Sequence, residues 1–174
     1  DIISHHLSNF YNKAKNEQIY PKELKTADVI PVHKKNEKTL AENYRPVSLI
    51  PIVSKLYEKN MYKEIMDYIQ NSLSPYLFGF RRGHSTEHCL TVMLEAWKKA
   101  LDEKSNAGAI LTDLSKAFDC LNHDLLIAKL SAYGFKQDAL NFIYSYLKDR
   151  KQRTKVGSEF SKWLEIKYGV PQGS

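Results

Sequence analysis

The most informative segment is Ala109-Ile110-Leu111-Thr112-Asp113-Leu114-Ser115-Lys116-Ala117-Phe118-Asp119, near the middle of a chain of 174 residues. An apolar run ending in an aspartate predicts a strand over 109–113 with Asp113 at its C-terminal end. The residues that follow predict a short turn carrying an aromatic ring, Phe118, and a second acid, Asp119. A carboxylate at a strand end suits a hard divalent metal such as Mg²⁺, which takes oxygen ligands. The alternative for Asp113 is an exposed acid with no metal.

The sequence Gly169-Val170-Pro171-Gln172-Gly173-Ser174 forms a second segment of special backbone shape. Proline stiffens such a loop, and glycine lets the backbone approach a ligand closely. The amide of Gln172 can hydrogen-bond the edge of a base or a sugar. A plain surface turn is the alternative. Together, the two segments lead us to expect a chain that acts on nucleic acid through bound magnesium.

A length of 174 residues allows one compact domain or two small ones, and a hydrophobic share of 43% is enough to bury a core. No repeat or low-complexity segment is present. The formal net charge is +6, and basic residues concentrate in two stretches. Such stretches bind phosphate backbones through counterion release, although lysine is also an ordinary surface residue. The two stretches contain Lys22, Lys25, Lys34, Lys35, Lys38, Arg45, Lys55, Lys59 and Lys63, and then Lys148, Arg150, Lys151, Arg153, Lys155, Lys162 and Lys167.

The sequence predicts an intracellular protein of the cytoplasm or nucleus, with no membrane partner. No apolar run approaches the roughly 20 residues that span a bilayer, and the first residues lack the layout of a signal peptide. Cys89 and Cys120 stand apart from any CxxC pair, which favours a reducing compartment. Because the chain starts without methionine, we expect it to be a fragment or a processed product.

Helical and strand patterns are intermixed, so the predicted fold class is α+β or α/β. Helical spacing of apolar residues predicts helices near 1–20, 54–70, 85–101, 124–133 and 137–147. Ser54 and Ser85 are the expected helix caps. Strands are predicted over 27–32, 44–50 and 109–113, with Pro46 marking an edge or a bulge, and a hairpin over 153–167 around Gly157.

Two other kinds of site are possible from the residue types alone. His84, His88 and Cys89 are close in sequence, but a zinc site needs a fourth ligand, and no residue pair is spaced to provide it. A hydrolase that pairs Asp113 with His123 would need both side chains on one face, which the intervening turn gives no reason to expect.

Five segments, in order, resemble the reverse transcriptase domain of non-LTR retrotransposons of the jockey-like type. They are residues 29–35 (VIPVHKK), 43–51 (NYRPVSLIP), 78–86 (FGFRRGHST), 112–123 (TDLSKAFDCLNH) and 169–174 (GVPQGS). The resemblance extends over nearly the whole chain. It implies a right-hand polymerase fold with an N-terminal helical segment over 1–20, fingers over 21–106 and a partial palm over 107–174. The hairpin near 153–167 would lie on the fingers side of that palm.

The resemblance also implies an activity and the residues that serve it. The reaction would be RNA-directed DNA synthesis, in which two Mg²⁺ ions assist transfer of a deoxynucleotide to a DNA primer on an RNA template. Asp113 matches the catalytic metal-binding aspartate, assisted by the backbone carbonyl of Leu114, and Phe118 matches the residue that discriminates deoxyribose from ribose. The other matching residues are expected to bind the incoming deoxynucleoside triphosphate (Lys34, Lys35, Arg45 and Gln172) or the template (Arg81 and Arg82).

The sequence departs from the family pattern at its end. An aromatic-x-Asp-Asp motif, which would supply the remaining catalytic aspartate in that family, does not occur between residues 1 and 174, and we expect no thumb within these residues. We therefore expect a truncated chain that does not polymerise alone. The alternative is a catalytically dead retrotransposon remnant that retains at most RNA or DNA binding.

Overall fold

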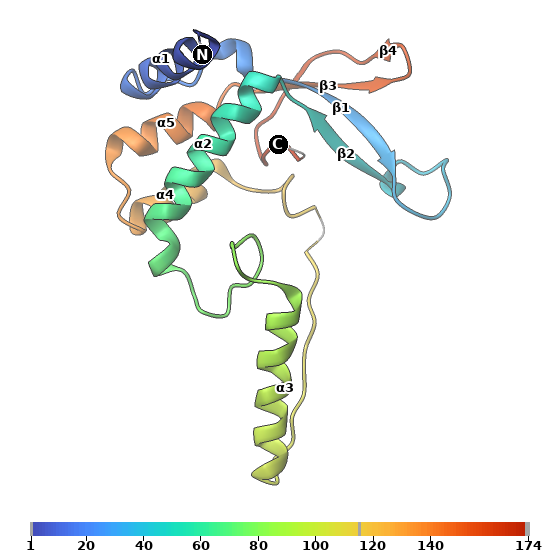
Figure 1. Cartoon of the computed structure of the whole chain (residues 1–174). Coiled ribbons are helices and arrows are strands. Elements are labelled where there is room, and N and C mark those ends of the chain that lie inside the picture. The colour runs from blue at the N-terminus through green and yellow to red at the C-terminus, as the bar shows by residue number, and fades with distance from the viewer. Residues whose placement is uncertain (1, 115, 173–174) are drawn as a thin grey trace. The chain divides into compact units, whose positions relative to one another are not determined.

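The computed structural model describes residues 2–114 and 116–172 (Figure 1). The mixed α+β class is confirmed, since the described chain contains both helices and a mixed sheet. The helices are α1 (Ile2–Asn16), α2 (Ile52–Ile69), α3 (Thr86–Asp102), α4 (His123–Ala132) and α5 (Gln137–Leu147). The strands are β1 (Thr26–His33), β2 (Tyr44–Leu49), β3 (Lys151–Val156), β4 (Glu159–Phe160) and β5 (Leu164–Glu165). No helix of the described residues is both long and apolar enough to cross a bilayer.

The chain divides into two compact units that do not follow sequence order. The first unit comprises Asp1–Met66 and Lys116–Ser174, and it contains the sheet, α1, α4, α5 and most of α2. The second unit comprises Asp67–Ser115 and contains α3. The predicted division into fingers and palm at residues 106 and 107 stays a prediction.

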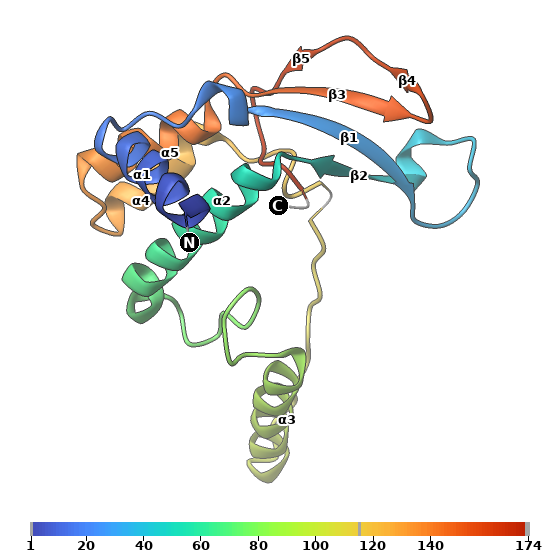
Figure 2. The same ribbon diagram turned by 45° about the horizontal axis from the view of Figure 1, so that its top comes forward.

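The sheet of the first unit has the order β2-β1-β3-β4, with β5 also paired to β3 (Figure 2). β1 and β2 form the expected antiparallel pair, and Pro46 lies on β2 at the edge of the sheet, where proline is tolerated. The hairpin predicted around Gly157 is confirmed by antiparallel pairing of β3 with β4. β3 runs parallel to β1, with Asp28 opposite Arg153. The sequence patterns predicted these two strands but not that they pair with each other.

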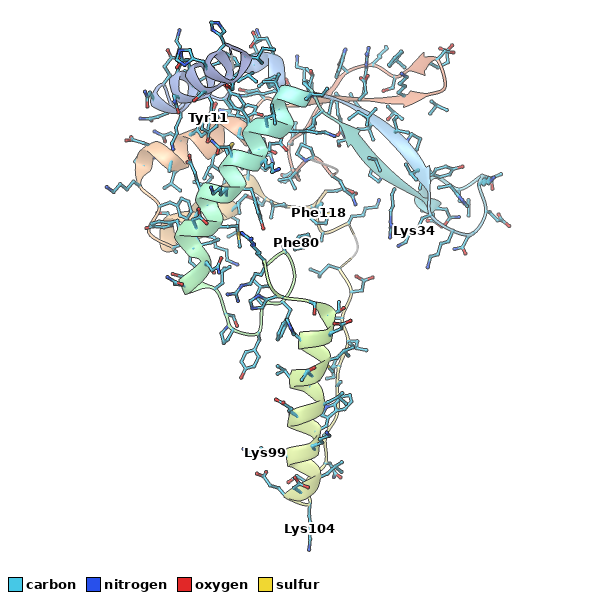
Figure 3. The ribbon with its side chains drawn as sticks, in the orientation of Figure 1. Tyr11, Lys34, Phe80, Lys99, Lys104 and Phe118 are labelled. Atoms are coloured by element: carbon cyan, nitrogen blue, oxygen red, sulfur yellow. The ribbon has the colours of Figure 1, made fainter. Side chains whose placement is uncertain are left out.

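An aromatic cluster forms the centre of the helical core. The rings of Tyr11 and Tyr57 meet edge to face with centroids 4.8 Å apart, and the ring of Tyr20 meets that of Tyr146 at 5.0 Å (Figure 3 labels Tyr11). Ser54 was predicted to cap a helix, but α2 begins at Ile52 and Ser54 is fully buried within it. Its hydroxyl lies 2.8 Å from the Tyr20 hydroxyl, so this serine satisfies a buried polar group instead.

Two members of the basic stretches are not surface residues. Arg150 is only 1% exposed, its guanidinium lies 4.8 Å from the centre of the Tyr146 ring, and its Nη1 donates to the Tyr146 carbonyl at 3.2 Å. Lys25 is also buried, and this burial lowers its pKa. The expectation that these stretches bind phosphate therefore fails for Arg150 and Lys25, because packing against neighbouring helices and strands removes both from solvent.

The predicted strand over 109–113 is wrong. This segment pairs with none of the described strands, and Ile110 and Leu111 are 94% and 90% exposed. A strand forms only when a neighbouring strand accepts its backbone hydrogen bonds. The apolar composition of residues 109–113 is typical of a buried strand, but no strand among the described residues pairs with this segment.

Tyr57 gives a stability prediction. Its hydroxyl is buried and has no hydrogen-bond partner among the described residues, and burial raises its pKa to about 12. We expect Tyr57→Phe to raise the free energy of unfolding by about 1 kcal/mol at neutral pH, because an unsatisfied polar group is removed. Urea denaturation of the full chain measures this change.

The pH dependence provides a second measurement. An unfolded tyrosine titrates near pH 10, so the folded state is favoured below about pH 10 and loses that advantage as the pH rises toward 12. Tyr57→Phe should lose less stability than the parent chain between about pH 10 and 12. Tyr76→Phe serves as the control, because Tyr76 is 74% exposed and its replacement should change neither quantity. Equal stability of Tyr57→Phe and the parent at both pH values would contradict the assignment.

Candidate nucleotide site

The end of the first informative segment and the C-terminal motif lie against each other in the first unit. The Phe118 turn (residues 116–119) and the C-terminal segment (residues 169–172) are joined by backbone hydrogen bonds. Val170 N–H donates to the Phe118 carbonyl at 2.9 Å, and Gly169 N–H donates to the Leu121 carbonyl at 2.8 Å. The Nε2 atom of His123 lies 2.7 Å from the Gly169 carbonyl oxygen. Ser115, Gly173 and Ser174, which belong to the same two motifs, lie outside the described residues.

The close contact between the C-terminal segment and the Phe118 turn requires a glycine at position 169. Its φ is +83°, and a Cβ atom placed there would lie 2.6 Å from the Phe118 carbonyl oxygen and 2.8 Å from the Asp119 Cα. These are backbone atoms, so the turn cannot move aside as a flexible side chain would. The sequence predicted that a glycine here approaches a ligand, but in the structure Gly169 approaches the protein's own Phe118 turn.

The C-terminal segment also attaches to the edge of the sheet. Ser48 N–H on β2 donates to the Gln172 carbonyl at 2.7 Å. Next to this bond is a pocket of about 190 Å³, whose lining includes Pro46, Ser48, Asp119, Gln152 and Gln172. This volume is smaller than the roughly 300 Å³ at which small-molecule pockets usually begin. The pocket is therefore suited to part of a nucleotide, such as a sugar or a base edge, rather than to a whole one.

Three exposed basic residues lie at the far end of the β1–β2 hairpin, which we call the basic end (Lys34, Lys35 and Arg45). Figure 3 labels Lys34 there. Arg45 pairs with Val32 across the hairpin, and Lys34 N–H donates to the Asn43 carbonyl at 2.8 Å. The side-chain amide of Asn43 donates to the Glu37 carbonyl at 2.8 Å, which braces the connecting loop. The structure thus brings together the three cations that the sequence assigned to triphosphate binding. Because strand residues alternate, Arg45 lies on the opposite face of β2 from the pocket-lining Pro46.

Four predicted site residues, Arg81, Arg82, Asp113 and Leu114, belong to the second unit and lie outside its helix. Asp113 and Leu114 are exposed and lie outside regular secondary structure. Arg82 is exposed, whereas Arg81 is partly buried and its Nη1 donates to the Ser74 carbonyl at 3.0 Å. Arg81 therefore braces its own loop, and Arg82 is the more accessible of the two arginines expected at the template. No sequence pattern predicts this difference, because the two positions are adjacent and both are arginine.

The described residues fit a metal site only in part. The carboxylate of Asp113 and the carbonyl of Leu114 are oxygen donors, which is the ligand type that Mg²⁺ prefers. Over residues 2–114 and 116–172, however, no three His, Cys, Asp or Glu side chains gather closely enough to hold a metal. His84 and His88 contact each other edge to face, with ring centroids 6.4 Å apart. The imidazole of His123, the other residue considered for hydrolysis, contacts the Gly169 backbone.

Comparison with known proteins gives one consistent answer. The family model for reverse transcriptase (RNA-dependent DNA polymerase) matches residues 32–174. The probable RNA-directed DNA polymerase from transposon BS of Drosophila melanogaster is 33% identical over 97% of this chain. The corresponding polymerase from transposon X-element is 31% identical over 90% of the chain, and that from the mobile element jockey is 28% identical over 97%, both from the same organism.

The matched region is a small part of each relative. The chain spans 19%, 18% and 19% of the length of these three proteins, respectively. The family match nevertheless extends over most of this chain, from the basic end of the β1–β2 hairpin to the C-terminal segment. The resemblance to reverse transcriptases of jockey-like non-LTR retrotransposons is confirmed, and the chain belongs to the reverse transcriptase family.

Proposed function

We propose that this chain forms the fingers and part of the palm of an RNA-directed DNA polymerase. The observation that carries the proposal is the attachment of the C-terminal segment to both the Phe118 turn and the β2 edge. This attachment brings Phe118, Gln172 and the small pocket into one unit with the basic end of the β1–β2 hairpin. A site for an incoming deoxynucleoside triphosphate needs these elements: cations for phosphate, a cavity for the sugar or base, and a bulky group beside the ribose.

Each described residue then has a role set by its chemistry. Lys34, Lys35 and Arg45 would bind the triphosphate. Because β2 is the edge strand, Arg45 would reach round it from the face opposite the pocket, and arginine can bind phosphate through two parallel hydrogen bonds. Gln172 would contact the sugar or base from the pocket, and Arg82 would contact a template phosphate. Phe118, which is 44% exposed, would stand where a ribose 2′-hydroxyl would otherwise fit.

Asp113 and the Leu114 carbonyl would hold a divalent metal in the complete polymerase. The metal, when bound, stabilises charge on the attacking 3′-oxygen and on the leaving pyrophosphate.

The proposal is tested by primer extension on an RNA template with a DNA primer, deoxynucleotides and Mg²⁺. The complete polymerase that contains this sequence should extend the primer. The 174-residue chain alone should not, because its described residues do not assemble a metal site. A complete protein that binds the primer–template but never extends it would overturn the proposal.

A catalytically dead remnant that only binds nucleic acid is the second candidate, favoured by the exposed and unpaired 109–113 segment. It differs in which substitutions matter. Lys34→Ala and Arg45→Ala would lower RNA affinity in either case, since both remove phosphate contacts. Only for a polymerase would an Asp113 substitution abolish an activity while leaving RNA affinity intact.

Phe118→Ala tests sugar selection in the complete polymerase. Removing the ring should increase incorporation of ribonucleotides relative to deoxynucleotides by about 10- to 100-fold, because steric exclusion of the 2′-hydroxyl is lost. Phe118→Tyr keeps the bulk and should retain selection. Single-nucleotide incorporation with matched ribo- and deoxynucleotides gives both kcat/KM values. Unchanged selection in Phe118→Ala would remove Phe118 from this role.

A further inference from the structure

A stack of one cation and two aromatic rings lies on the outer hairpin of the sheet. The guanidinium of Arg153 on β3 lies 3.9 Å from the centre of the Phe160 ring and 4.6 Å from that of Trp163. Its Nε donates to the Asp28 carboxylate on β1 at 2.7 Å. We call Arg153, Phe160 and Trp163 the cation–aromatic stack.

The rings of this stack are held in place but remain accessible. Phe160 and Trp163 are 45% and 44% exposed. Arg153 cannot leave them easily, because its ion pair with Asp28 fixes it to the neighbouring strand and its own exposure is only 29%. Aromatic rings that are exposed and already oriented lose little conformational entropy when a flat partner stacks on them.

The stack lies on the sheet face opposite the small pocket. Gln152 lines the pocket, and side chains of successive strand residues point to opposite faces, so Arg153 points away from it. The register supports this placement, since Asp28 is paired with Arg153 and bonded to it. A ligand of the stack would therefore be distinct from a nucleotide in the pocket.

The charge around the stack favours an anionic partner. The Nζ of Lys155 lies 5.3 Å from the centre of the Phe160 ring, and Lys151 and Lys162 are exposed on the same hairpin. The nearest acid, Asp28, is neutralised by its ion pair with Arg153. The remaining hairpin acids are Glu159 and Glu165, which leaves an excess of positive charge beside two exposed rings.

We propose that the cation–aromatic stack binds single-stranded RNA, with a base stacked on Trp163 and flanking phosphates bound by Lys155 and Lys162. Surfaces that hold single strands combine basic residues with aromatic rings in this way. In a duplex the bases are already stacked on each other, so their faces are not available to Trp163. The inference does not require polymerisation, and its failure would leave the proposed polymerase untouched.

Tryptophan fluorescence tests the proposal directly, because the chain contains only two tryptophans, Trp97 and Trp163. In Trp97→Phe the emission comes from Trp163 alone, and a base that stacks on the ring quenches it. Titration of the full chain with an oligouridine of about 12 nucleotides should quench this emission to a plateau. Trp163→Phe, which reports Trp97 alone, is the matched control for quenching that does not arise at the stack.

Affinity is measured separately, by anisotropy of the labelled oligouridine. Trp163→Ala should weaken binding about tenfold, whereas Trp163→Phe, which keeps a ring, should weaken it less than about threefold. Lys162→Ala should lower the salt dependence by about one phosphate contact. Circular dichroism of each variant confirms that the fold is retained.

Three results would overturn the inference. One is RNA binding detected by anisotropy while Trp163 emission stays constant. Another is a Trp163→Phe variant, folded as the parent is, that loses as much affinity as Trp163→Ala. The third is equal quenching of Trp163 emission by the oligouridine and by an RNA duplex of the same length.

Discussion

Asp113→Asn in the complete polymerase is expected to lower kcat for deoxynucleotide incorporation about a thousandfold, while RNA affinity changes less than about twofold. The substitution keeps the shape of the side chain and removes its charge. Loss of one preorganised electrostatic group at a reacting centre typically costs a factor of about 100 to 1,000 in rate. A metal ligand belongs at the upper end of this range, because its loss also displaces the ion.

The surroundings of Asp113 indicate that this substitution should leave the folded structure unchanged. Asp113 is exposed, lies in no helix or strand, and takes part in none of the ion pairs of the described residues. Asparagine at this position should therefore change the free energy of unfolding by less than about 0.5 kcal/mol. A fall in kcat can then be assigned to chemistry rather than to loss of folded protein.

Asp102→Asn is the matched control, because Asp102 is an exposed acid of the same unit at the end of α3. It should leave primer extension within about twofold of the parent. If Asp113→Asn retained more than about a tenth of the parent rate at saturating Mg²⁺, Asp113 would not be a metal ligand.

Local patterns in the sequence predicted the elements whose stability is local. Helix α5 was predicted over 137–147 and has those bounds, because Leu140, Ile143 and Leu147 form a stripe that packs into the core. Ser85 caps α3 as expected, accepting a hydrogen bond from the His88 N–H at 3.3 Å. Each of these features depends on residues a few positions apart, so a short window of sequence contains the whole signal.

Features that depend on distant partners were missed or misjudged. The parallel pairing of β1 with β3 joins the two separate chain segments that make up the first unit. Because these strands are far apart in sequence, no short sequence pattern predicts their pairing. The apolar run over 109–113 has strand composition but no strand beside it in the described chain. The burial of Arg150 was not predicted, because the distribution of charge along the sequence does not show that the Tyr146 ring covers its guanidinium.

The candidate site shows the same division. The family motifs identified Phe118, Gln172 and the basic residues one by one. They did not reveal that Gly169 fits against the Phe118 carbonyl, or that Ser48 holds Gln172 at the sheet edge. Those contacts are made by backbone atoms, which have the same chemistry at every position and leave no trace in composition.

Gly169→Ala is expected to lower the free energy of unfolding by at least about 3 kcal/mol. The left-handed backbone at φ +83° costs an alanine about 1–2 kcal/mol. The new Cβ would also lie 2.6 Å from the Phe118 carbonyl oxygen and 2.8 Å from the Asp119 Cα, so the C-terminal segment must separate from the Phe118 turn. Separation breaks the Val170–Phe118 and Gly169–Leu121 hydrogen bonds.

Gly157→Ala separates the two contributions. Gly157 also has a positive φ, +60°, but a Cβ there meets nothing within 4 Å. Its replacement should cost about 1–2 kcal/mol, which is the cost of the left-handed backbone alone. Urea denaturation of both variants under the same conditions gives the difference, and that difference is the energetic value of the close approach at Gly169.

The same pair of variants connects the contact to function. In the complete polymerase, Gly169→Ala should displace Gln172 from the β2 edge and lower kcat/KM for deoxynucleotides well below the value for Gly157→Ala. The pocket beside Ser48 exists only while the C-terminal segment stays attached, since Gly169 and Gln172 both line it. If the two variants were equally stable and equally active, the packing of Gly169 against the Phe118 turn would not be what positions the nucleotide site.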